Sequence, residues 1–228
     1  MSDSHFYTGR GDGGYTGLLG PERVPKHDLR PEACGTVDEA QAALGVVRTS
    51  GCTPKTGEIL LAVQRDMYAL MAELAAAGDA DSPFAGSVTA DYVTRLESWM
   101  GGLEAQVAIP RQFVIPGDSR PGAALHLART IVRRAERSVV RLVHAGLLSN
   151  RLPAPGNTAS LAGTDASPRS EAGLCPRSVP TTEGRARQER AGSPGVVAYL
   201  NRLSSLLFVL ALFEDQVATK HEPTLYKE

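Results

Sequence analysis

The stretch that decides the fold is FVIPGDSRPGAALHLARTIVRRAER, residues 113–137. It begins with a turn signal, Pro116-Gly117, and continues with the spacing of a helix. At about 3.6 residues per turn, one stripe of this helix is polar and consists of His126, Arg129, Arg133 and Arg137. The neighbouring stripe is apolar and consists of Leu125, Ala128, Val132, Ala135 and Val139. The pattern predicts a helix that packs on one face and presents a row of arginines beside it.

The arginine row is a candidate anion site. Like charges four residues apart on a helix repel by roughly 0.2–0.5 kcal/mol per pair, so an anion that meets the row would stabilise it. Glu136 can neutralise one of these arginines. The remaining guanidinium groups suit a polyphosphate or the carboxylate of a partner. A solvated helix face is the alternative that the pattern leaves open.

Length and composition favour a single domain, residues 1–228, with enough chain for a sizeable core. The formal net charge is −1, so the chain lacks the basic excess typical of nucleic-acid or membrane-surface binders. We expect no membrane span, and the N-terminus lacks the basic and apolar regions of a signal peptide. Cys34, Cys52 and Cys175 are too few and too scattered for a disulfide framework or a zinc site. These features predict a cytoplasmic protein.

Four more segments have apolar residues at helical spacing: residues 35–48, 55–77, 87–107 and 195–220. In the first of these segments, Thr36 and Glu39 form a predicted capping box. The arginine helix is expected to continue to about residue 148. No strand pattern of useful length is present. Residues 149–194 are rich in Pro, Gly, Ser and Thr, which predicts a disordered insertion. We therefore expect an all-α protein, a five-helix bundle.

The N-terminal segment, residues 1–27, is rich in glycine, which allows positive φ and close approach of the backbone to a ligand. Hydroxyls, cations and one carboxylate lie among the glycines: Thr8, Arg10, Asp12, Thr16, Arg23 and Lys26. This composition is typical of a loop that cradles phosphate. The segment has neither the Gly-Lys-Ser/Thr of a P-loop nor a dinucleotide fingerprint after a strand. A flexible tail remains the alternative.

Five blocks of the sequence, taken in order, resemble the PduO-type ATP:cob(I)alamin adenosyltransferases. They read TGRGDGGYTGLLG, RVPKHDLRPEACGTVDEA, FVIPGDS, ALHLARTIVRRAER and YLNRLSSLLFVLA, and they cover residues 7–48, 113–142 and 197–212. The resemblance implies a five-helix bundle that assembles as a homotrimer, with active sites at the subunit interfaces. Its implied substrates are ATP, bound with Mg²⁺, and cobalamin.

The resemblance also assigns roles to residues. The N-terminal loop would wrap the triphosphate of ATP through Thr8, Gly9, Arg10, Gly11, Asp12, Gly14, Thr16 and Lys26. Other implied ATP-binding residues are Arg133, Glu136, Arg137 and Asn201. Arg129 would pair with Asp38 of the neighbouring subunit, and Phe113 would occupy the lower face of the corrin, where it favours four-coordinate cobalt.

The implied reaction needs no nucleophilic side chain, because Co(I) itself attacks the 5′-carbon of ATP and releases triphosphate. The protein would orient the two substrates and stabilise the charge on the triphosphate. An adenosylcobalamin-dependent enzyme and a cobalamin reductase are the expected partners. Two alternatives stay open: a carrier or sensor that binds ATP or cobalamin without turnover, and a structural bundle whose arginines make only ion pairs between subunits.

Overall fold

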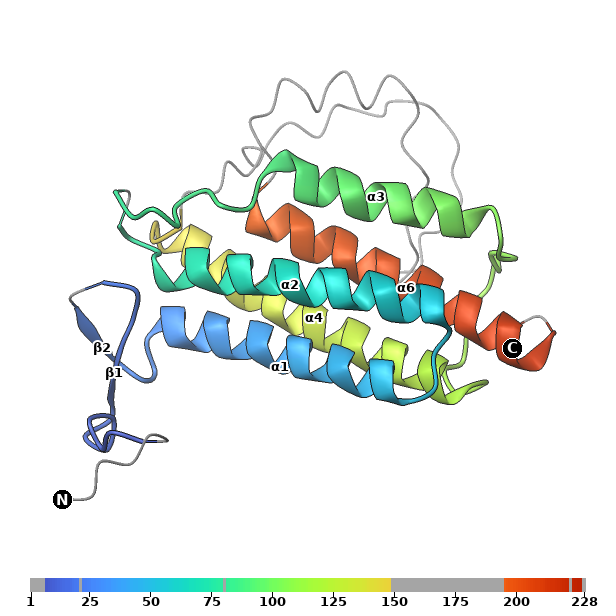
Figure 1. Cartoon of the computed structure of the whole chain (residues 1–228), viewed down its shortest axis with the longest axis horizontal. Coiled ribbons are helices and arrows are strands. Elements are labelled where there is room, and N and C mark those ends of the chain that lie inside the picture. Colours follow the sequence, from blue (N-terminus) through green and yellow to red (C-terminus); the bar gives the residue numbers. More distant parts are fainter. Residues whose placement is uncertain (1–6, 21, 80, 149–194, 222, 227–228) are drawn as a thin grey trace, which may run out of the picture.

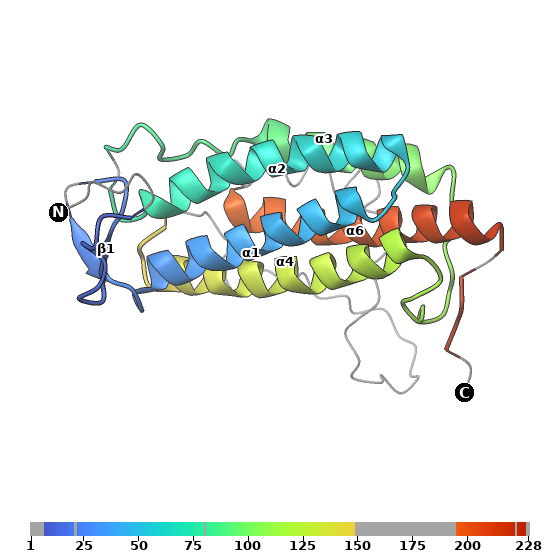
Figure 2. The ribbon, with the colours of Figure 1, turned by 60° about the horizontal axis from the view of Figure 1, so that its bottom comes forward.

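The computed structural model describes residues 7–20, 22–79, 81–148, 195–221 and 223–226. These residues form five helices and a two-stranded hairpin: β1 (Tyr15–Gly17), β2 (Arg23–Pro25), α1 (Leu29–Thr49), α2 (Pro54–Ala75), α3 (Ala90–Glu104), α4 (Arg120–His144) and α6 (Val196–Thr219). The helices lie side by side along the long axis of the molecule, and the hairpin projects beyond the start of α1 (Figures 1 and 2). The prediction of a mostly helical protein with five helices is confirmed. The predicted insertion, 149–194, lies outside the described residues.

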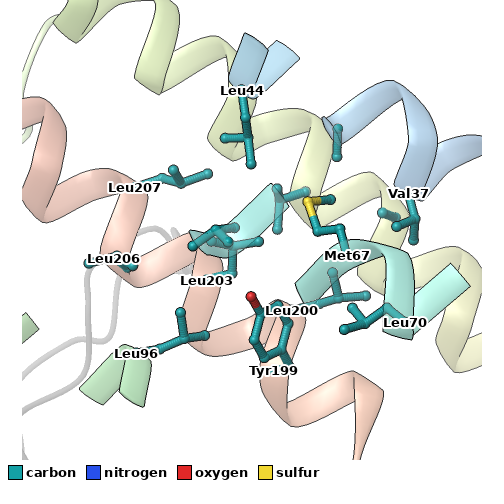
Figure 3. Packing of buried hydrophobic residues seen from close by; sticks show 14 of the residues in the cluster. Val37, Leu44, Met67, Leu70, Leu96, Tyr199, Leu200, Leu203, Leu206 and Leu207 are labelled. Carbon is teal, nitrogen blue, oxygen red and sulfur yellow. The ribbon is translucent and has the colours of Figure 1, made fainter. Parts of the chain in front are cut away.

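The central helix is α6. It packs against α4 and α3, while α1 packs against α4 and α2. Figure 3 shows the apolar side chains that α6 contributes meeting those of α1, α2 and α3, and the labelled ones include Tyr199, Leu200, Leu203, Leu206, Leu207, Met67, Leu70, Val37, Leu44 and Leu96. The apolar stripe predicted on α4, from Leu125 to Val139, is fully buried. The arginine row therefore lies at the edge of a packed face, as predicted.

By length and composition α6, residues 196–219, is apolar enough to cross a membrane, although the sequence holds no continuous apolar run of that length. The helix is apolar on nearly all sides because it is surrounded by other helices, and most of its residues are buried. A helix that is apolar all round is typical of the centre of a helical protein as well as of a membrane span.

The start of α1 differs from the prediction. The helix begins at Leu29, where the side chain of Asp28 accepts a hydrogen bond of 2.9 Å from the Arg30 amide. Thr36 lies inside the helix, buried, and its hydroxyl donates to the Ala33 carbonyl. The capping box at Thr36 is therefore wrong. Pro31 concealed the real start, although proline is tolerated in the first turn of a helix.

Two smaller corrections concern element ends. The arginine helix, α4, ends at His144 rather than near residue 148, and α3 ends at Glu104 rather than near 107. The hairpin was not predicted, because strands of three residues are too short to show an alternating pattern. Its register pairs Tyr15 with Pro25 and Gly17 with Arg23.

Buried polar groups gather where α4 begins. Asp215 of α6 is 1% exposed and accepts a hydrogen bond of 2.6 Å from the Ser119 hydroxyl. It faces Gly122, where a Cβ would lie 1.9 Å from the Asp215 Oδ1. His126, one turn further along, is 4% exposed, and its ring centroid lies 5.9 Å from that of Phe208. Neither ring nitrogen of His126 has a hydrogen-bond partner among the described residues.

The contact between Gly122 and Asp215 predicts a local stability effect. Gly122→Ala should lower the free energy of unfolding by about 1–3 kcal/mol, because Asp215 must leave its hydrogen bond to Ser119 to admit the methyl group. Gly101→Ala, in the last turn of α3 with nothing within 4 Å, should instead raise it by about 0.5–1 kcal/mol. Urea unfolding of both variants measures the difference, and equal stabilities would contradict the close packing at Gly122.

The buried imidazole predicts a pH dependence. Burial, with a smaller effect from the Arg129 charge, lowers the pKa of His126 from 6.5 to about 4. Between pH 4 and 6.5, His126 is therefore protonated in the unfolded chain and neutral in the folded chain. The free energy of unfolding consequently decreases as the pH falls from about 6.5 to 4. The loss should be on the order of 2–3 kcal/mol. His126→Leu should lose less over the same interval in urea unfolding curves, and identical pH profiles would contradict a neutral buried His126.

Candidate functional site

The glycine-rich segment folds into consecutive turns. The Asp12 amide donates to the Gly9 carbonyl at 3.2 Å, and the Gly14 amide donates to the Gly11 carbonyl at 3.1 Å. Gly9 and Gly14 have φ values of +68° and +80°, which only glycine adopts without strain. The Lys26 amide then donates to the Gly14 carbonyl at 2.9 Å and joins the turns to the hairpin. The segment is thus a compact loop rather than an extended tail.

Cationic side chains surround this loop. The Lys26 ammonium lies against Gly11, where a Cβ would be 3.2 Å from Nζ. The guanidinium of Arg23 donates to the carbonyls of Arg10 and Tyr15, so it braces the loop from within. That bracing role was missed, because the sequence showed Arg23 only as one more cation near the glycines. The hydroxyl of Thr16 donates to its neighbour's carbonyl, Gly17, at 3.3 Å.

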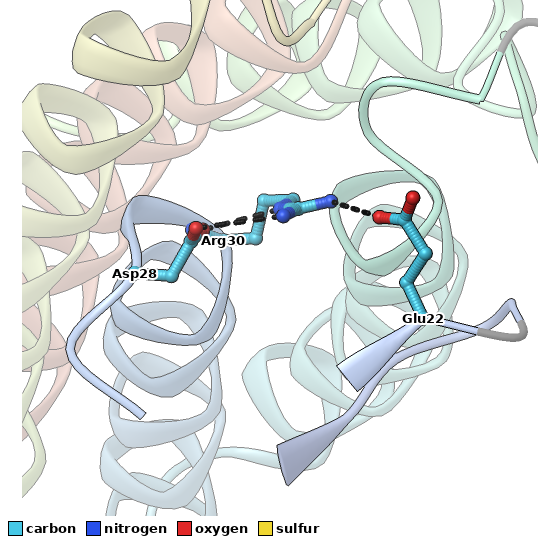
Figure 4. Close-up of polar contacts among 3 residues, drawn as sticks. All are labelled: Glu22, Asp28 and Arg30. Carbon is cyan, nitrogen blue, oxygen red and sulfur yellow. Dashed lines mark hydrogen bonds and ion pairs between the residues drawn. The ribbon is translucent and has the colours of Figure 1, made fainter. Parts of the chain in front are cut away.

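The loop is tied to the helices at the start of α1. Arg30 lies between Asp28, at 3.1 Å, and Glu22, at 4.0 Å (Figure 4). The hydrogen bonds from Arg30 hold the pKa of the Asp28 carboxyl below its usual range. Glu22 is largely exposed, so its ion pair with Arg30 contributes little to stability, and the contact of Arg30 with Asp28 lies within the start of α1 itself.

The arginines of α4 follow one another at one-turn intervals along the helix. Arg129 is half-buried, its Nε has no hydrogen-bond partner among the described residues, and burial together with the charge of Arg133 lowers its pKa. Arg133 is half-buried and Arg137 is exposed, with the Arg137 guanidinium donating to the Arg133 carbonyl at 3.1 Å. In the part of the chain that the structure describes, no carboxylate forms an ion pair with these three residues. Their positive charge is therefore available to a ligand or a partner.

Two acidic residues make contacts other than those predicted. Glu136 does not neutralise an arginine of its own helix. It accepts a hydrogen bond of 3.1 Å from the Asn201 amide of α6. The ion pair that does join α1 to α4 is between Glu39 and Arg134. Asp38, on the same helix as Glu39, is exposed and makes no ion pair among the described residues.

Asn201 belongs to a longer chain of polar contacts. Its Oδ1 accepts a hydrogen bond of 2.7 Å from Nη1 of Arg202, and Nε of Arg202 donates to Glu97 of α3 at 3.0 Å. The prediction placed Asn201 and Glu136 in one pocket, and the structure brings them together. Arg202 and Glu97 were missed, since a charged pair on two separate helices leaves no local signal in the sequence.

Phe113 lies on the connector between α3 and α4 and is 49% exposed. The C-terminal segment holds this connector in place. The Phe113 carbonyl accepts from the Tyr226 amide, and the Ile115 amide donates to the Thr224 carbonyl, each at 2.9 Å. Hydrogen bonds from Thr224 to Asp118 lower the pKa of that carboxyl and fix the segment further. An aromatic ring is thus presented on a firmly held backbone.

One chain does not bring the predicted site residues together. The glycine-rich loop lies at the end of the helical body where α1 begins, and the connector with Phe113 lies at the opposite end, where α4 begins (Figure 1). Among the described residues, no hydrogen bond or ion pair joins residues 7–26 to α4. The loop, the arginine row and Phe113 are separate parts within a single copy.

The chain is similar to known proteins along most of its length. The model of the cobalamin adenosyltransferase family matches residues 6–154. The corrinoid adenosyltransferase PduO of Salmonella typhimurium is 29% identical over 223 residues, covering 98% of this chain and 53% of PduO. The cobalamin adenosyltransferase of Cupriavidus metallidurans is 38% identical over 149 residues, covering 64% of this chain and 77% of that protein.

Solved structures agree on the fold. A variant of the PduO-type ATP:corrinoid adenosyltransferase from Lactobacillus reuteri, complexed with cobalamin and ATP, superposes with a TM-score of 0.70 at 24% identity and covers 97% of this chain and 99% of that one. At this identity the likeness supports the fold alone. The chain spans about half the length of the PduO proteins that it matches. The family match, which includes the glycine-rich loop and the arginine helix, identifies the chain as a member of the cobalamin adenosyltransferase family.

Proposed function

We propose that the protein transfers the 5′-deoxyadenosyl group of ATP to the Co(I) centre of cobalamin, giving adenosylcobalamin and triphosphate. The observation that supports this best is the row of arginines on α4. Arg129 and Arg133 are half-buried, and no arginine of the row forms an ion pair with a carboxylate among the described residues. Such a row suits a polyphosphate, whose oxygens accept hydrogen bonds from guanidinium forks. The relatives named above are corrinoid adenosyltransferases, which agrees with this substrate.

The active site would form between copies of the chain, in a homotrimer. The loop and the Phe113 connector lie at opposite ends of one copy, so a second copy would have to supply the missing part. Exposed apolar side chains on the two helices concerned support such a contact, since Val46 of α1 and Leu127 of α4 are each 60% exposed. Asp38, exposed on α1, would then reach Arg129 of the neighbouring copy and neutralise it.

The nucleotide would be held from two sides. The turns of residues 9–14 and the ammonium of Lys26 would surround the triphosphate of ATP, and Arg133 of the neighbouring copy would meet it from the other side. Arg137 lies one turn further along the same stripe. Asn201 and Glu136 offer a neutral donor and an acceptor, which suit the adenosine part better than the phosphates.

Mg²⁺ would bind through the phosphate oxygens of ATP. No group of three potential ligands among the described residues could hold a metal ion by itself, so the nucleotide would supply most of the coordination. When bound, Mg²⁺ neutralises charge that develops on the triphosphate as it leaves.

Phe113 would face the corrin from below. Its exposed ring could occupy the space of the lower axial ligand and exclude water, which favours four-coordinate cobalt. The nucleophile in this reaction is the cobalt of the substrate, so the protein's task is to align it with the 5′-carbon of ATP. Adenosylcobalamin would pass to an enzyme that depends on it, and a cobalamin reductase would supply the reduced substrate.

The second candidate is a trimer that binds ATP or cobalamin as a carrier or sensor without turnover. The exposed, firmly held Phe113 favours the enzyme, since binding alone does not need an aromatic ring that removes an axial ligand. Anaerobic incubation with ATP, Mg²⁺ and chemically reduced cobalamin separates the two. The enzyme forms adenosylcobalamin and releases triphosphate, whereas a carrier binds its ligands unchanged.

The same assay tests the role of the arginine row. Arg133→Ala should lower turnover by about 100-fold or more, because the triphosphate loses a preorganised cation in the transition state. Arg141→Ala removes an exposed arginine two turns further along α4 and should leave turnover near that of the wild type. Melting temperatures confirm that both variants fold. Near-wild-type turnover by Arg133→Ala would contradict the assignment of the phosphate site.

A further inference from the structure

We propose that Arg202 and Glu97 are positioning residues for the nucleotide, because they fix the orientation of the Asn201 amide. The inference rests on the proposed function in one respect, namely that Asn201 contacts ATP. It adds two residues, one of them on α3, the helix that contributes no other residue to the site. Neither residue needs to touch the substrate.

The contacts form an unbroken chain across three helices. Glu97 of α3 accepts from Nε of Arg202 at 3.0 Å, and Nη1 of Arg202 donates to Oδ1 of Asn201 at 2.7 Å. Nδ2 of Asn201 donates to Oε1 of Glu136 on α4 at 3.1 Å. Each donor in the chain meets an acceptor, and each contact lies within the normal range of a hydrogen bond.

This chain permits only one orientation of the amide. If the Asn201 amide were rotated by half a turn, its NH₂ group would face a guanidinium and its carbonyl oxygen would face a carboxylate. Both contacts would then be repulsive. On the side of the Asn201 carbonyl oxygen, Arg202 determines the orientation, because a guanidinium can donate a hydrogen bond but cannot accept one. Without this neighbour, the Glu136 carboxylate alone would select the orientation of the amide, and the Asn201 carbonyl oxygen would lose its donor.

Glu97 in turn decides where the guanidinium lies. A free arginine side chain has many rotamers, and the bond from Nε to Glu97 leaves Nη1 directed at Asn201. The side chains of Arg202 and Glu97 are 30% and 35% exposed. An ion pair as accessible as this contributes little to the stability of the fold. The guanidinium of Arg202 uses Nε to donate to Glu97 and Nη1 to donate to Asn201. This geometry is better explained by a role in orienting Asn201 than by a role in stabilising the fold.

The test is equilibrium binding of ATP with Mg²⁺ to the full chain without cobalamin, so that no reaction can occur. Arg202→Gln should weaken ATP binding by about three- to tenfold, the effect of one misdirected hydrogen bond. Arg202→Lys should weaken ATP binding to a similar degree, because a single ammonium cannot donate to both Glu97 and Asn201 in this geometry. A role of charge alone predicts instead that Arg202→Lys binds like the wild type.

Two substitutions of Glu97, one that removes its acceptor and one that keeps it, form a matched test. Glu97→Ala should weaken ATP binding, whereas Glu97→Gln should restore it, because a neutral amide oxygen still accepts from Nε of Arg202. The matched control is Arg48→Gln, which removes another arginine that bridges two helices through one hydrogen bond, to Gln64, far from α6 in the chain. It should leave ATP binding unchanged.

The outcomes separate this inference from the proposed function. If the wild type binds ATP but forms no product, the proposed function fails and the binding test still decides the role of Arg202. If all Arg202 and Glu97 variants bind ATP as the wild type does, the inference is overturned and the proposed function stands. A drop in melting temperature without a change in ATP binding would also overturn it, since the pair would then be structural only. A wild type that does not bind ATP would overturn both.

Discussion

The rest of the structure depends on positive charge held at the edge of a packed helix face. To bury the stripe from Leu125 to Val139 against α1 and α6, α4 must place its neighbouring stripe at the boundary of the helical body. Arg129 and Arg133 lie on that stripe, half-buried, and burial together with the charge of Arg133 lowers the pKa of Arg129. Partial burial strengthens the attraction of the row for an anion and makes an empty row costly. The glycine-rich loop has a cation of its own, because the Lys26 ammonium lies against Gly11.

No hydrogen bond or ion pair joins the loop to the arginine row among the described residues of one copy, and under the proposed function this separation would account for several other features. Asp38 is exposed near an ion pair, Glu39 with Arg134, that already joins α1 to α4. Val46 and Leu127 expose apolar surface on the same two helices. The Phe113 connector is fixed by backbone pairing with the C-terminal segment at the far end from the loop. A second copy that covers the α1 and α4 faces would complete the site and bury this surface at once.

The sequence was most informative where periodicity reports packing. The stripes of α4, the five helices and the proximity of Asn201 to Glu136 follow from helical spacing and from the family resemblance. It was least informative where structure arises from single contacts between distant segments. The three-residue strands, the pairing of Tyr226 with Phe113 and the pair of Arg202 with Glu97 have no local pattern. The capping error at Thr36 has a different cause, because two plausible N-caps compete in one segment, and the helix starts after Asp28, whose side chain caps the Arg30 amide.

The most direct test of a site shared between copies is complementation by mixed assemblies. Lys26→Ala removes a cation from the loop and Arg133→Ala removes one from α4, so each chain alone should be nearly inactive with ATP and reduced cobalamin. Co-expressed chains should regain activity, because some interfaces combine an intact loop from one chain with an intact α4 from the other. Random assortment predicts about one quarter of the wild-type activity. Mixed assemblies that form but regain no activity would contradict the account, since the loop and the arginines would then act within a single chain.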